Sequence, residues 1–290
     1  MAVAYERLSR EVNVAGARVP TFFYGTAWKE DGTERLTTQA LELGFRAVDT
    51  ANQRKHYVEA AVGRAVSNAV GRGMVARSAL FLQTKFTHVG GQGAELPYDS
   101  SAEPGAQVMQ SFASSLEHLG TDYLDSYVLH GPVARRGLTA EDRETWQAMS
   151  GLERSARVRL LGVSNVTHEQ LELFCDGVGT APAFVQNRCY ATTGWDRDVR
   201  AVCARHGIRY QAFSLLTANP GVLRDPRVAG IARRLGVTTP VVLFRFALDL
   251  GMIPLTGTSS AAHAREDMGV YDLAPLTDAE LEMIERILLR

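Results

Sequence analysis

The sequence predicts an α/β protein folded as one (β/α)8 TIM barrel, in which strands and helices alternate. Short apolar runs alternate with longer amphipathic stretches along the whole chain. No low-complexity tract and no Pro-, Gly- or Ser-rich linker divides the 290 residues, so we expect a single domain over residues 1–290. The length suits a barrel of about 250 residues, and the hydrophobic content of 46% is enough for a large core.

Eight short runs are predicted to be strands, because they are rich in Val, Leu, Phe and Tyr. They lack a clean alternation of apolar and polar residues, which is typical of strands buried on both faces of a parallel sheet. The runs are Thr21–Tyr24, Phe45–Asp49, Leu80–Gln83, Ser126–Leu129, Arg159–Val163, Phe184–Val185, Arg209–Ala212 and Met252–Pro254.

Amphipathic helices are predicted between these strands, since apolar residues recur there at helical spacing. Thr33 is the expected N-cap of the first helix, and Pro240 lies near the start of the last, where proline is tolerated. The predicted helices are Glu34–Leu43, Tyr57–Val70, Gln107–Leu119, Thr139–Leu152, Thr167–Phe174, Asp196–Arg205 and Pro240–Leu250.

Two segments are additions to a minimal barrel. Residues Val12–Pro20 are predicted to form an N-terminal β-hairpin, with Ala-Gly at its turn, that caps the floor of the barrel. The long loop Phe86–Pro104 after the third strand is expected to overhang the C-terminal rim, where barrel active sites lie. A doubly wound sheet is the main alternative, but the Gly-rich segment Gly90–Leu96 follows the third strand and opens no helix.

Charge and composition narrow the expected partners to small molecules. The chain has 31 basic and 32 acidic side chains, and this balance argues against nucleic acid or an anionic membrane as a partner. The N-terminal segment lacks the apolar run of a signal peptide, so we expect a cytoplasmic protein. The three cysteines are too few for a disulfide framework, the histidines lack metal-ligand spacing, and no metal is expected.

Polar residues follow several predicted strands at their C-terminal ends. Asp49 ends the second strand, Lys85 the third and His130 the fourth, while Ser164-Asn165 and Gln186-Asn187 follow the fifth and sixth. In a barrel these ends meet at one mouth. An aspartate, a lysine and a histidine at one mouth indicate acid–base chemistry.

Eight pieces of the sequence together resemble the aldo-keto reductase family, from about Val12 to the C-terminus. They are VPTFFYGTAW (19–28), GFRAVDTANQRKHYVEAAVGRA (44–65), LFLQTK (80–85), SSLEHLGTDYLDSYVLHGP (114–132), LLGVSNV (160–166), VQNRCY (185–190), IRYQAFS (208–214) and MIPLTGTSSAAHARED (252–267). The resemblance implies a barrel that binds an extended nicotinamide dinucleotide without Rossmann glycines. It also implies a catalytic tetrad, which in this sequence is Asp49, Tyr57, Lys85 and His130.

The tyrosine of this tetrad is displaced in the sequence. The family usually places it five residues after the aspartate, where this chain has Arg54, and NQRKHY contains a two-residue insertion. Tyr57 is the tyrosine within reach; its alternative role is to pack at a helix start. His56 is the next candidate proton donor, and Arg54 an electrostatic one.

The chemistry of the tetrad follows from the charge that the reaction creates. Hydride transfer turns a carbonyl oxygen into an alkoxide, which must receive a proton. Lys85 would make the phenol of Tyr57 a better acid, Asp49 would hold that ammonium, and His130 would bond the substrate oxygen.

The resemblance also implies which residues contact the cofactor. Ser164, Asn165 and Gln186 would bond the nicotinamide carboxamide, and Phe213 would stack on the ring, with core packing as its alternative. Thr26 and Ala27 would approach the ribose through their backbone. The segment 214–219, with Ser214 and Leu216, would run beneath the pyrophosphate.

The adenosine end is expected at LTGTSSAAHARED. Many members of the family have a Lys-Ser pair and an arginine here, whereas this chain has Leu255-Thr256 and His263. NADPH is the expected cofactor, with NADH possible. A phosphate cradle with Thr256, Gly257, Thr258 and Ser259, a 2′-phosphate contact from His263 or Arg265, and an adenine contact from Glu266 complete the predicted site. Arg265 could instead be a solvated helix residue.

The substrate pocket is expected to be lined by aromatic residues at loop ends. These are Trp28, Tyr57, Phe86, Tyr98, Tyr190 and Trp195. They favour an apolar or aromatic carbonyl or alcohol substrate, although core packing explains each one equally well.

We therefore expect an NAD(P)H-dependent oxidoreductase that reduces an aldehyde or ketone. The first alternative is a catalytically weak, sensory or regulatory relative that keeps the cofactor site. The second is a lyase or isomerase with Lys85 as a Schiff-base amine, which Asp49 disfavours by keeping the amine protonated. No heptad or edge pattern in the sequence indicates an oligomer.

Overall fold

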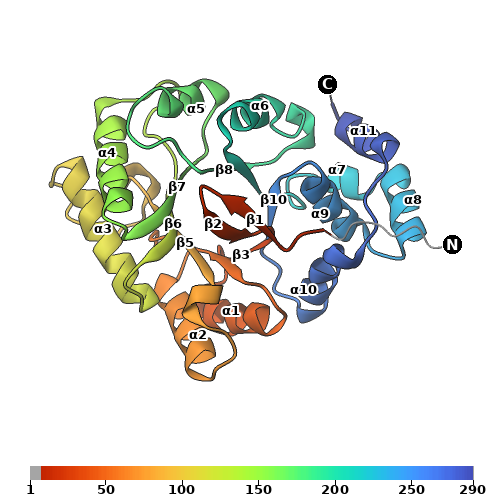
Figure 1. Cartoon of the computed structure of the whole chain (residues 1–290), viewed down its shortest axis with the longest axis horizontal. Coiled ribbons are helices and arrows are strands. Elements are labelled where there is room, and N and C mark those ends of the chain that lie inside the picture. Colours follow the sequence, from red (N-terminus) through yellow and green to blue (C-terminus); the bar gives the residue numbers. More distant parts are fainter. Residues whose placement is uncertain (1–7, 290) are drawn as a thin grey trace.

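The computed structural model describes residues 8–289 and contains a closed barrel of eight parallel strands surrounded by helices (Figure 1). Around the ring the strands follow the order β10-β3-β4-β5-β6-β7-β8-β9, and β10 closes the ring by pairing with both β3 and β9. This topology confirms the predicted TIM barrel and excludes the doubly wound sheet.

Each predicted strand run overlaps one barrel strand. The strands are β3 (Phe23–Gly25), β4 (Ala47–Asp49), β5 (Phe81–Phe86), β6 (Leu124–Leu129), β7 (Val158–Ser164), β8 (Phe184–Arg188), β9 (Arg209–Phe213) and β10 (Ile253–Thr256). Several continue further toward the mouth than expected, because polar residues such as Lys85 and Gln186 are still paired with their neighbouring strands.

All seven predicted helices are present, and residues 8–289 contain four further helices that were not predicted. The helices are α1 (Thr33–Glu42), α2 (Glu59–Gly71), α3 (Pro104–Leu119), α4 (Ala140–Arg154), α5 (His168–Cys175), α6 (Arg197–His206), α7 (Pro220–Leu223), α8 (Pro226–Leu235), α9 (Thr239–Asp249), α10 (Ala261–Met268) and α11 (Asp278–Arg286). Short 3-10 turns are η1 (Glu30–Gly32), η2 (Arg77–Ala79), η3 (Val89–Gly91), η4 (Ala191–Thr193) and η5 (Gly269–Asp272).

The expected N-cap of the first helix is wrong by one residue. Gly32 is the N-cap of α1, and Thr33 is already helical. The Thr33 hydroxyl donates to the Glu30 carbonyl in the preceding turn instead of capping the helix. Among the described residues, no helix is both long and apolar enough to cross a bilayer.

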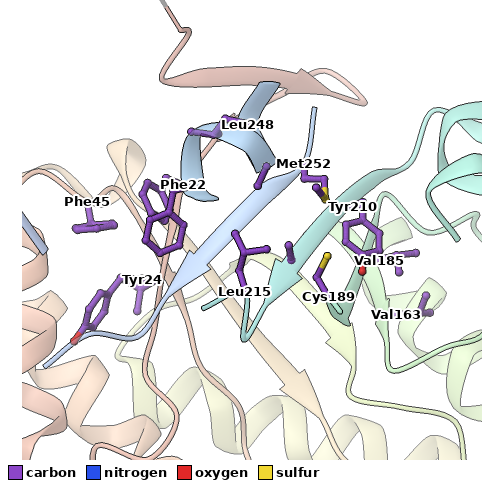
Figure 2. Close-up of a cluster of buried hydrophobic side chains, with 14 of the residues drawn as sticks. Phe22, Tyr24, Phe45, Val163, Val185, Cys189, Tyr210, Leu215, Leu248 and Met252 are labelled. Carbon is purple, nitrogen blue, oxygen red and sulfur yellow. The ribbon is translucent and has the colours of Figure 1, made fainter. Parts of the chain in front are cut away.

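The larger hydrophobic core lies between the barrel and its helices. Phe22, just before β3, illustrates the packing: its ring centroid lies 5.6 Å from that of Phe45 and 4.8 Å from that of Phe244 on α9. Figure 2 shows Phe22, Tyr24 and Phe45 on one side of this core, with Cys189 and Tyr210 further along the barrel wall. Such packing fixes the strands whose far ends form the mouth.

A smaller core fills the N-terminal floor of the barrel. The hairpin β1 (Glu11–Val14) and β2 (Ala17–Pro20) crosses this end of the barrel (Figure 1), as predicted. Both turn residues, Ala15 and Gly16, have positive φ, as a two-residue hairpin turn requires. Val14 and Val19 of the hairpin belong to one buried cluster with the inward-facing strand residues Phe23, Ala47, Phe81, Leu160, Phe184, Ile253 and Leu255. The floor is therefore closed, and access is from the opposite end.

Candidate functional site

The main cavity opens at the C-terminal ends of the barrel strands and has a volume of about 710 Å³. It extends from Asp49 at the end of β4 to α10 at the outer wall. Its lining residues are Gly25, Ala27, Trp28, Lys29, Asp49, Tyr57, His130, Ser164, Asn165, Gln186, Arg188, Phe213, Ser214, Leu215, Leu216, Thr217, Thr238, Pro240, Phe244, Leu255, Thr256, Gly257, Thr258, His263, Glu266 and Asp267.

A buried ion pair lies at the deep end of the cavity. Lys85 Nζ is 2.7 Å from both carboxylate oxygens of Asp49 and 2.8 Å from the Thr50 carbonyl oxygen, so all three ammonium protons have partners. Both side chains are almost completely buried. Burial lowers the pKa of Lys85, and the charge of Asp49 opposes that shift.

Tyr57 lies beside this pair, on the turn that precedes α2. Lys85 Nζ is 5.3 Å from the centroid of the Tyr57 ring, and the imidazole of His130 packs against that ring edge-on, with 6.0 Å between centroids. Burial, followed by the negative charge of Asp49, raises the pKa of Tyr57 above its usual value. The phenol is therefore protonated across the physiological pH range.

His130 follows β6 and is uncharged at neutral pH. Burial, with the positive charges of Lys85 and His56 as lesser causes, lowers the pKa of His130 to about 3. Its Nδ1 lies 2.7 Å from the Thr87 hydroxyl. When Thr87 donates this bond, the ring proton is on Nε2, which is then a donor toward the cavity.

The long loop after β5 supports the turn that carries Tyr57. The Gln92 side chain donates to the Asn52 carbonyl at 2.9 Å, and Gln53 donates to the Gly91 carbonyl at 2.7 Å. Arg54 forms an ion pair with Glu95 at 2.7 Å, so its guanidinium points to the loop and is not a cavity residue. The loop expected to overhang the cavity thus braces the NQRKHY insertion, and no residue of it lines the cavity.

Three glutamines form a polar layer beneath the mouth. Gln83 and Gln186 both donate to Asp49 Oδ1, at 2.8 and 3.0 Å. Gln211 accepts from both, at 2.8 and 2.9 Å, and donates to Gln83 at 3.0 Å. The layer links β4, β5, β8 and β9 across the barrel and fixes the position of the Asp49 carboxylate.

The residues predicted to contact nicotinamide gather around Gln186. Ser164 donates to the Gln186 carbonyl, Asn165 donates to the His130 carbonyl at 2.8 Å, and Phe213 is in the cavity wall. Asn165 has a positive φ, a conformation that Asn adopts more readily than most residues. Ala27 lines the cavity, whereas the fully buried Thr26 does not; its hydroxyl donates to the Asp49 carbonyl.

At the outer end of the cavity, only some of the residues predicted to contact the phosphates and adenosine lie in the wall. Gly257, Thr258, His263 and Glu266 line it together with Thr256, but Ser259 and Arg265 are exposed and outside it. The Thr256 hydroxyl donates to Asp267 at 2.8 Å, so it is not free for a phosphate. Burial raises the pKa of Asp267 to about 6, although the Thr256 hydrogen bond opposes this shift.

Four of the six predicted substrate-pocket aromatics are outside the cavity. Phe86 and Trp195 are fully buried in the core between barrel and helices, and the nearly buried Tyr98 donates to the Thr87 carbonyl. Tyr190 lies near Arg188 but is not in the wall. Of the others, Tyr57 lines the cavity, as does Trp28, which is 68% exposed and stacks on His56 with 3.6 Å between ring centroids.

Several site residues were not predicted from the sequence. Lys29 donates to the Gly257 carbonyl in the cavity wall, and Arg188 lies within 6 Å of the Phe213 ring centroid. Gln83 and Gln211 could have been recognised as polar residues inside strands that are otherwise buried. Other lining residues that were not predicted are Gly25 at the end of β3, Thr238 just before α9, Pro240 and Phe244 on α9, and Asp267 on α10. Among residues 8–289, no three His, Cys, Asp or Glu side chains are grouped as metal ligands would be.

Most of the chain is similar in sequence to known proteins. Residues 22–289 match the family model described as "Aldo/keto reductase family". An aldo-keto reductase of Mycolicibacterium smegmatis is 31% identical over 242 residues, which are 83% of this chain and 80% of that protein. An uncharacterised oxidoreductase of Bacillus subtilis is 26% identical over 94% of this chain and 90% of its own.

Two solved structures share the fold. A crystal structure of an aldo/keto reductase from Brucella melitensis has a TM-score of 0.80 and 26% identity, and the match covers 96% of this chain and 98% of that one. A Bombyx mori aldo-keto reductase in complex with NADP has a TM-score of 0.80 and 24% identity, over 95% of this chain and 92% of that one.

Proposed function

Because the chain belongs to the aldo/keto reductase family, a family of oxidoreductases, we propose that it reduces an aldehyde or ketone to an alcohol with a nicotinamide dinucleotide. The observation that carries this proposal is the assembly of Tyr57, Lys85, Asp49 and His130 around one end of one cavity. Asp49, Lys85 and His130 come from the ends of three neighbouring strands and Tyr57 from the turn before α2, and their types match what carbonyl reduction requires.

The cavity fits an extended dinucleotide, with NADPH proposed first and NADH second. Its volume of about 710 Å³ lies in the range of ligand sites, and it runs from the barrel axis to α10. Lys29 places a cation in its wall, and the Bombyx mori protein with the same fold was crystallised with NADP. The bound dinucleotide would supply the hydride.

Tyr57 is proposed as the general acid. Its raised pKa keeps the phenol protonated until a stronger base appears. The alkoxide formed at the carbonyl oxygen is such a base, and it takes the proton from the Tyr57 hydroxyl as the C–O double bond becomes single. Lys85, beside the ring, stabilises the phenolate that remains.

His130 and Asp49 are proposed to prepare this transfer. Uncharged His130 orients the substrate oxygen through Nε2 and carries part of its developing charge. Asp49 holds the ammonium of Lys85 in place at 2.7 Å. We further propose that residues 1–290 act as one domain and that the partner is a small carbonyl or alcohol compound.

One observation favours a second candidate, a cofactor-binding relative with little turnover. The three ammonium protons of Lys85 are directed to Asp49 and Thr50, and none of its hydrogen bonds goes to the Tyr57 hydroxyl. With these hydrogen bonds, Lys85 acts on the phenol of Tyr57 only through the electrostatic effect of its charge. Dinucleotide binding without reduction of any aldehyde would support this candidate.

The test is Tyr57→Phe, with turnover and dinucleotide affinity measured separately. We expect kcat for an aromatic aldehyde to fall at least about 100-fold, because general acid catalysis is worth roughly that much. The Kd for NADPH, followed by tryptophan fluorescence, should stay within about twofold, since no charge or stacking surface is lost.

The matched control is Tyr271→Phe, which removes a hydroxyl bonded to Thr21 outside the cavity. It should keep wild-type kcat. Full activity in Tyr57→Phe would transfer the role of proton donor to another group, and His56 would be the first to test.

A further inference from the structure

Trp28 is an exposed aromatic residue at the edge of the cavity. Its side chain lines the cavity although the residue is 68% exposed, whereas Trp146 and Trp195 are fully buried. The backbone of Trp28 has a φ of +60°, a conformation that bulky residues rarely adopt. Backbone strain of this kind is found most often at active sites and ligand clamps. An indole this exposed has few packing partners, so its position depends on the groups that contact it.

His56 contacts Trp28 at two points. The two rings are stacked, with 3.6 Å between centroids and an angle of 34° between planes, so the imidazole covers one face of the indole. The Trp28 N–H also donates to the His56 carbonyl at 2.8 Å. Aromatic pairs attract each other beyond the effect of the area they bury. The covered face and the backbone bond together fix where the indole lies.

The imidazole of His56 is an uncharged stacking surface. It makes no side-chain hydrogen bond among the described residues, its Nδ1 is buried without a partner, and it does not line the cavity. Burial, followed by the positive charge of Lys55, lowers the pKa of His56 below its usual value. The ring is therefore neutral at pH 7, and stacking is the contact that it makes with the site.

The turn that carries His56 is itself held in place. The backbone N–H groups of His56 and Tyr57 both donate to the Gln53 carbonyl, at 3.3 and 3.1 Å. The Gln53 side chain donates in turn to the Gly91 carbonyl at 2.7 Å. His56 thus presents its ring from a braced turn, directly before the proposed general acid Tyr57.

We propose that His56, which is outside the cavity, is a positioning residue that holds Trp28 as a flat wall and makes the site prefer planar aromatic carbonyl compounds over saturated ones of similar size. The proposal rests on the function proposed above. A carbonyl group at the Tyr57 hydroxyl has its substituent close to Trp28, because both residues line the cavity and His56 joins them. The uncovered face of the indole can stack on an aromatic ring, whereas a puckered saturated ring makes less contact with it.

The experiment compares benzaldehyde with cyclohexanecarbaldehyde, which both carry a six-membered ring but differ in planarity. Values of kcat and KM are measured for each with the intact protein and saturating NADPH. The two aldehydes differ in intrinsic reactivity, so the quantity compared between variants is the ratio of their kcat/KM values. His56→Leu keeps bulk but removes the flat ring, and it should lower this ratio about fivefold through a higher KM for benzaldehyde, the effect of one lost aromatic contact.

Two further variants separate this role from a general disturbance of the turn. His56→Phe restores a flat ring and should restore the wild-type ratio. In Trp28→Ala the ratio should already be low, and adding His56→Leu should not lower it further, because His56 acts through the indole. Lys55→Ala, at the exposed neighbour of His56 in the same turn, is the control and should leave the ratio unchanged.

A second measurement needs no turnover. Because Trp146 and Trp195 are fully buried, iodide in solution quenches mainly the fluorescence of Trp28. His56→Ala uncovers the second face of the indole, so the quenching constant should rise. It should return to the wild-type value in His56→Phe and stay unchanged in Lys55→Ala.

The outcomes that contradict the inference differ from failure of the proposed function. An equal loss of kcat for both aldehydes in His56→Leu would show that the turn only supports Tyr57. An unchanged ratio in His56→Leu, a further fall of the ratio in the double variant, or an unchanged quenching constant in His56→Ala would show that His56 does not act through Trp28. If the wild type reduces neither aldehyde, the proposed function itself fails.

Discussion

The ring of His130 has a single hydroxyl, that of Thr87, within hydrogen-bond distance of its Nδ1 among the described residues. Thr87 Oγ1 lies 2.7 Å from Nδ1, and the pKa of His130 is lowered to about 3, mainly by burial. The neutral ring carries one proton, so a donor at Nδ1 places that proton on Nε2. When the Thr87 hydroxyl is that donor, Nε2 keeps its N–H for the substrate oxygen of the proposed reaction.

Thr87→Val should test the role of this hydroxyl. Without the hydroxyl the ring populates both tautomers, and kcat should fall about tenfold while the Kd for the dinucleotide stays unchanged. Because His130 is neutral above about pH 4, the wild-type rate should show no change near pH 6.5 that depends on His130.

The control is Thr145→Val on α4, since the Thr145 hydroxyl is buried without a partner among the described residues. Equal losses of kcat in both variants would show that Thr87 affects packing and not the tautomer.

At this scale the sequence predicted that Asp49, Lys85 and His130 lie together but not which aromatic residues line the cavity, and strand geometry explains both. Successive side chains of a strand point to opposite faces, so if Lys85 faces the barrel interior, its neighbour Phe86 must face the helices. Asp49 and His130 follow from strand ends in the same way. The role of the Thr256 hydroxyl could not be predicted, because its partner Asp267 lies eleven residues away on a helix.

Among the helices, α2 and α3 approach each other closely at a glycine. A Cβ added at Gly63 on α2 would lie 1.9 Å from the His118 carbonyl oxygen, which is backbone and cannot move aside. The position requires glycine because of this approach and not because of a turn.

Gly63→Ala should therefore destabilise the protein by about 3 kcal/mol or more in a urea titration, since the two helices must separate. Gly71→Ala at the end of the same helix is the matched control, because nothing lies within 4 Å of its added Cβ. It should be neutral or slightly stabilising. Equal stability of both variants would show that the helices have room to shift.

Asp267 on helix α10, in the wall of the outer cavity, makes the free energy of unfolding depend on pH. The pKa of Asp267 is raised from 3.8 to about 6, mainly by burial, so the folded protein holds this proton to a higher pH than the unfolded chain. The free energy of unfolding therefore decreases as the pH rises from about 4 to about 6, and the loss persists above that.

Asp267→Asn should remove this loss. At pH 8 it should be about 3 kcal/mol more stable than the wild type, with little difference at pH 4, because a shift of about two pKa units corresponds to about that energy. Melting temperatures between pH 4 and 8 measure the effect.

At the level of elements, the alternation of strands and helices in the sequence was sufficient to predict the barrel. It was not sufficient to predict the helices that are additional to this repeat. α8 has clear signals, with Asp225 as N-cap, Pro226 in its first turn and Gly236 at its end. It was missed because it lies between β9 and α9, where the repeating pattern expects one helix only. α10 was interpreted as a binding segment, and α7 is too short for its periodicity to be recognised.

The barrel has a closed end that contributes to stability and an open end that holds the candidate site. The floor is apolar and includes Val14 and Val19 of the hairpin, while the mouth holds the candidate site. The resemblance to the aldo-keto reductase family is confirmed by the match over residues 22–289, which starts after this hairpin.

Val19→Ala should test the separation of the two ends. Val19 is fully buried, so the change should cost about 2 kcal/mol of unfolding free energy through lost burial and a cavity. The Kd for the dinucleotide at the other end should not change. A weaker Kd together with normal folding would indicate that the hairpin influences the mouth.

Closure of the ring has a consequence for how the protein responds to its ligand. The cavity takes its wall from both β3 and β10, the first and last barrel strands, so the pocket exists only when those two have met. A nucleotide bound there would contact both strands. It would therefore oppose any opening of the barrel that separates the first strand from the last. At a hundred times its dissociation constant it would add about 2.7 kcal/mol to the stability of the entire chain.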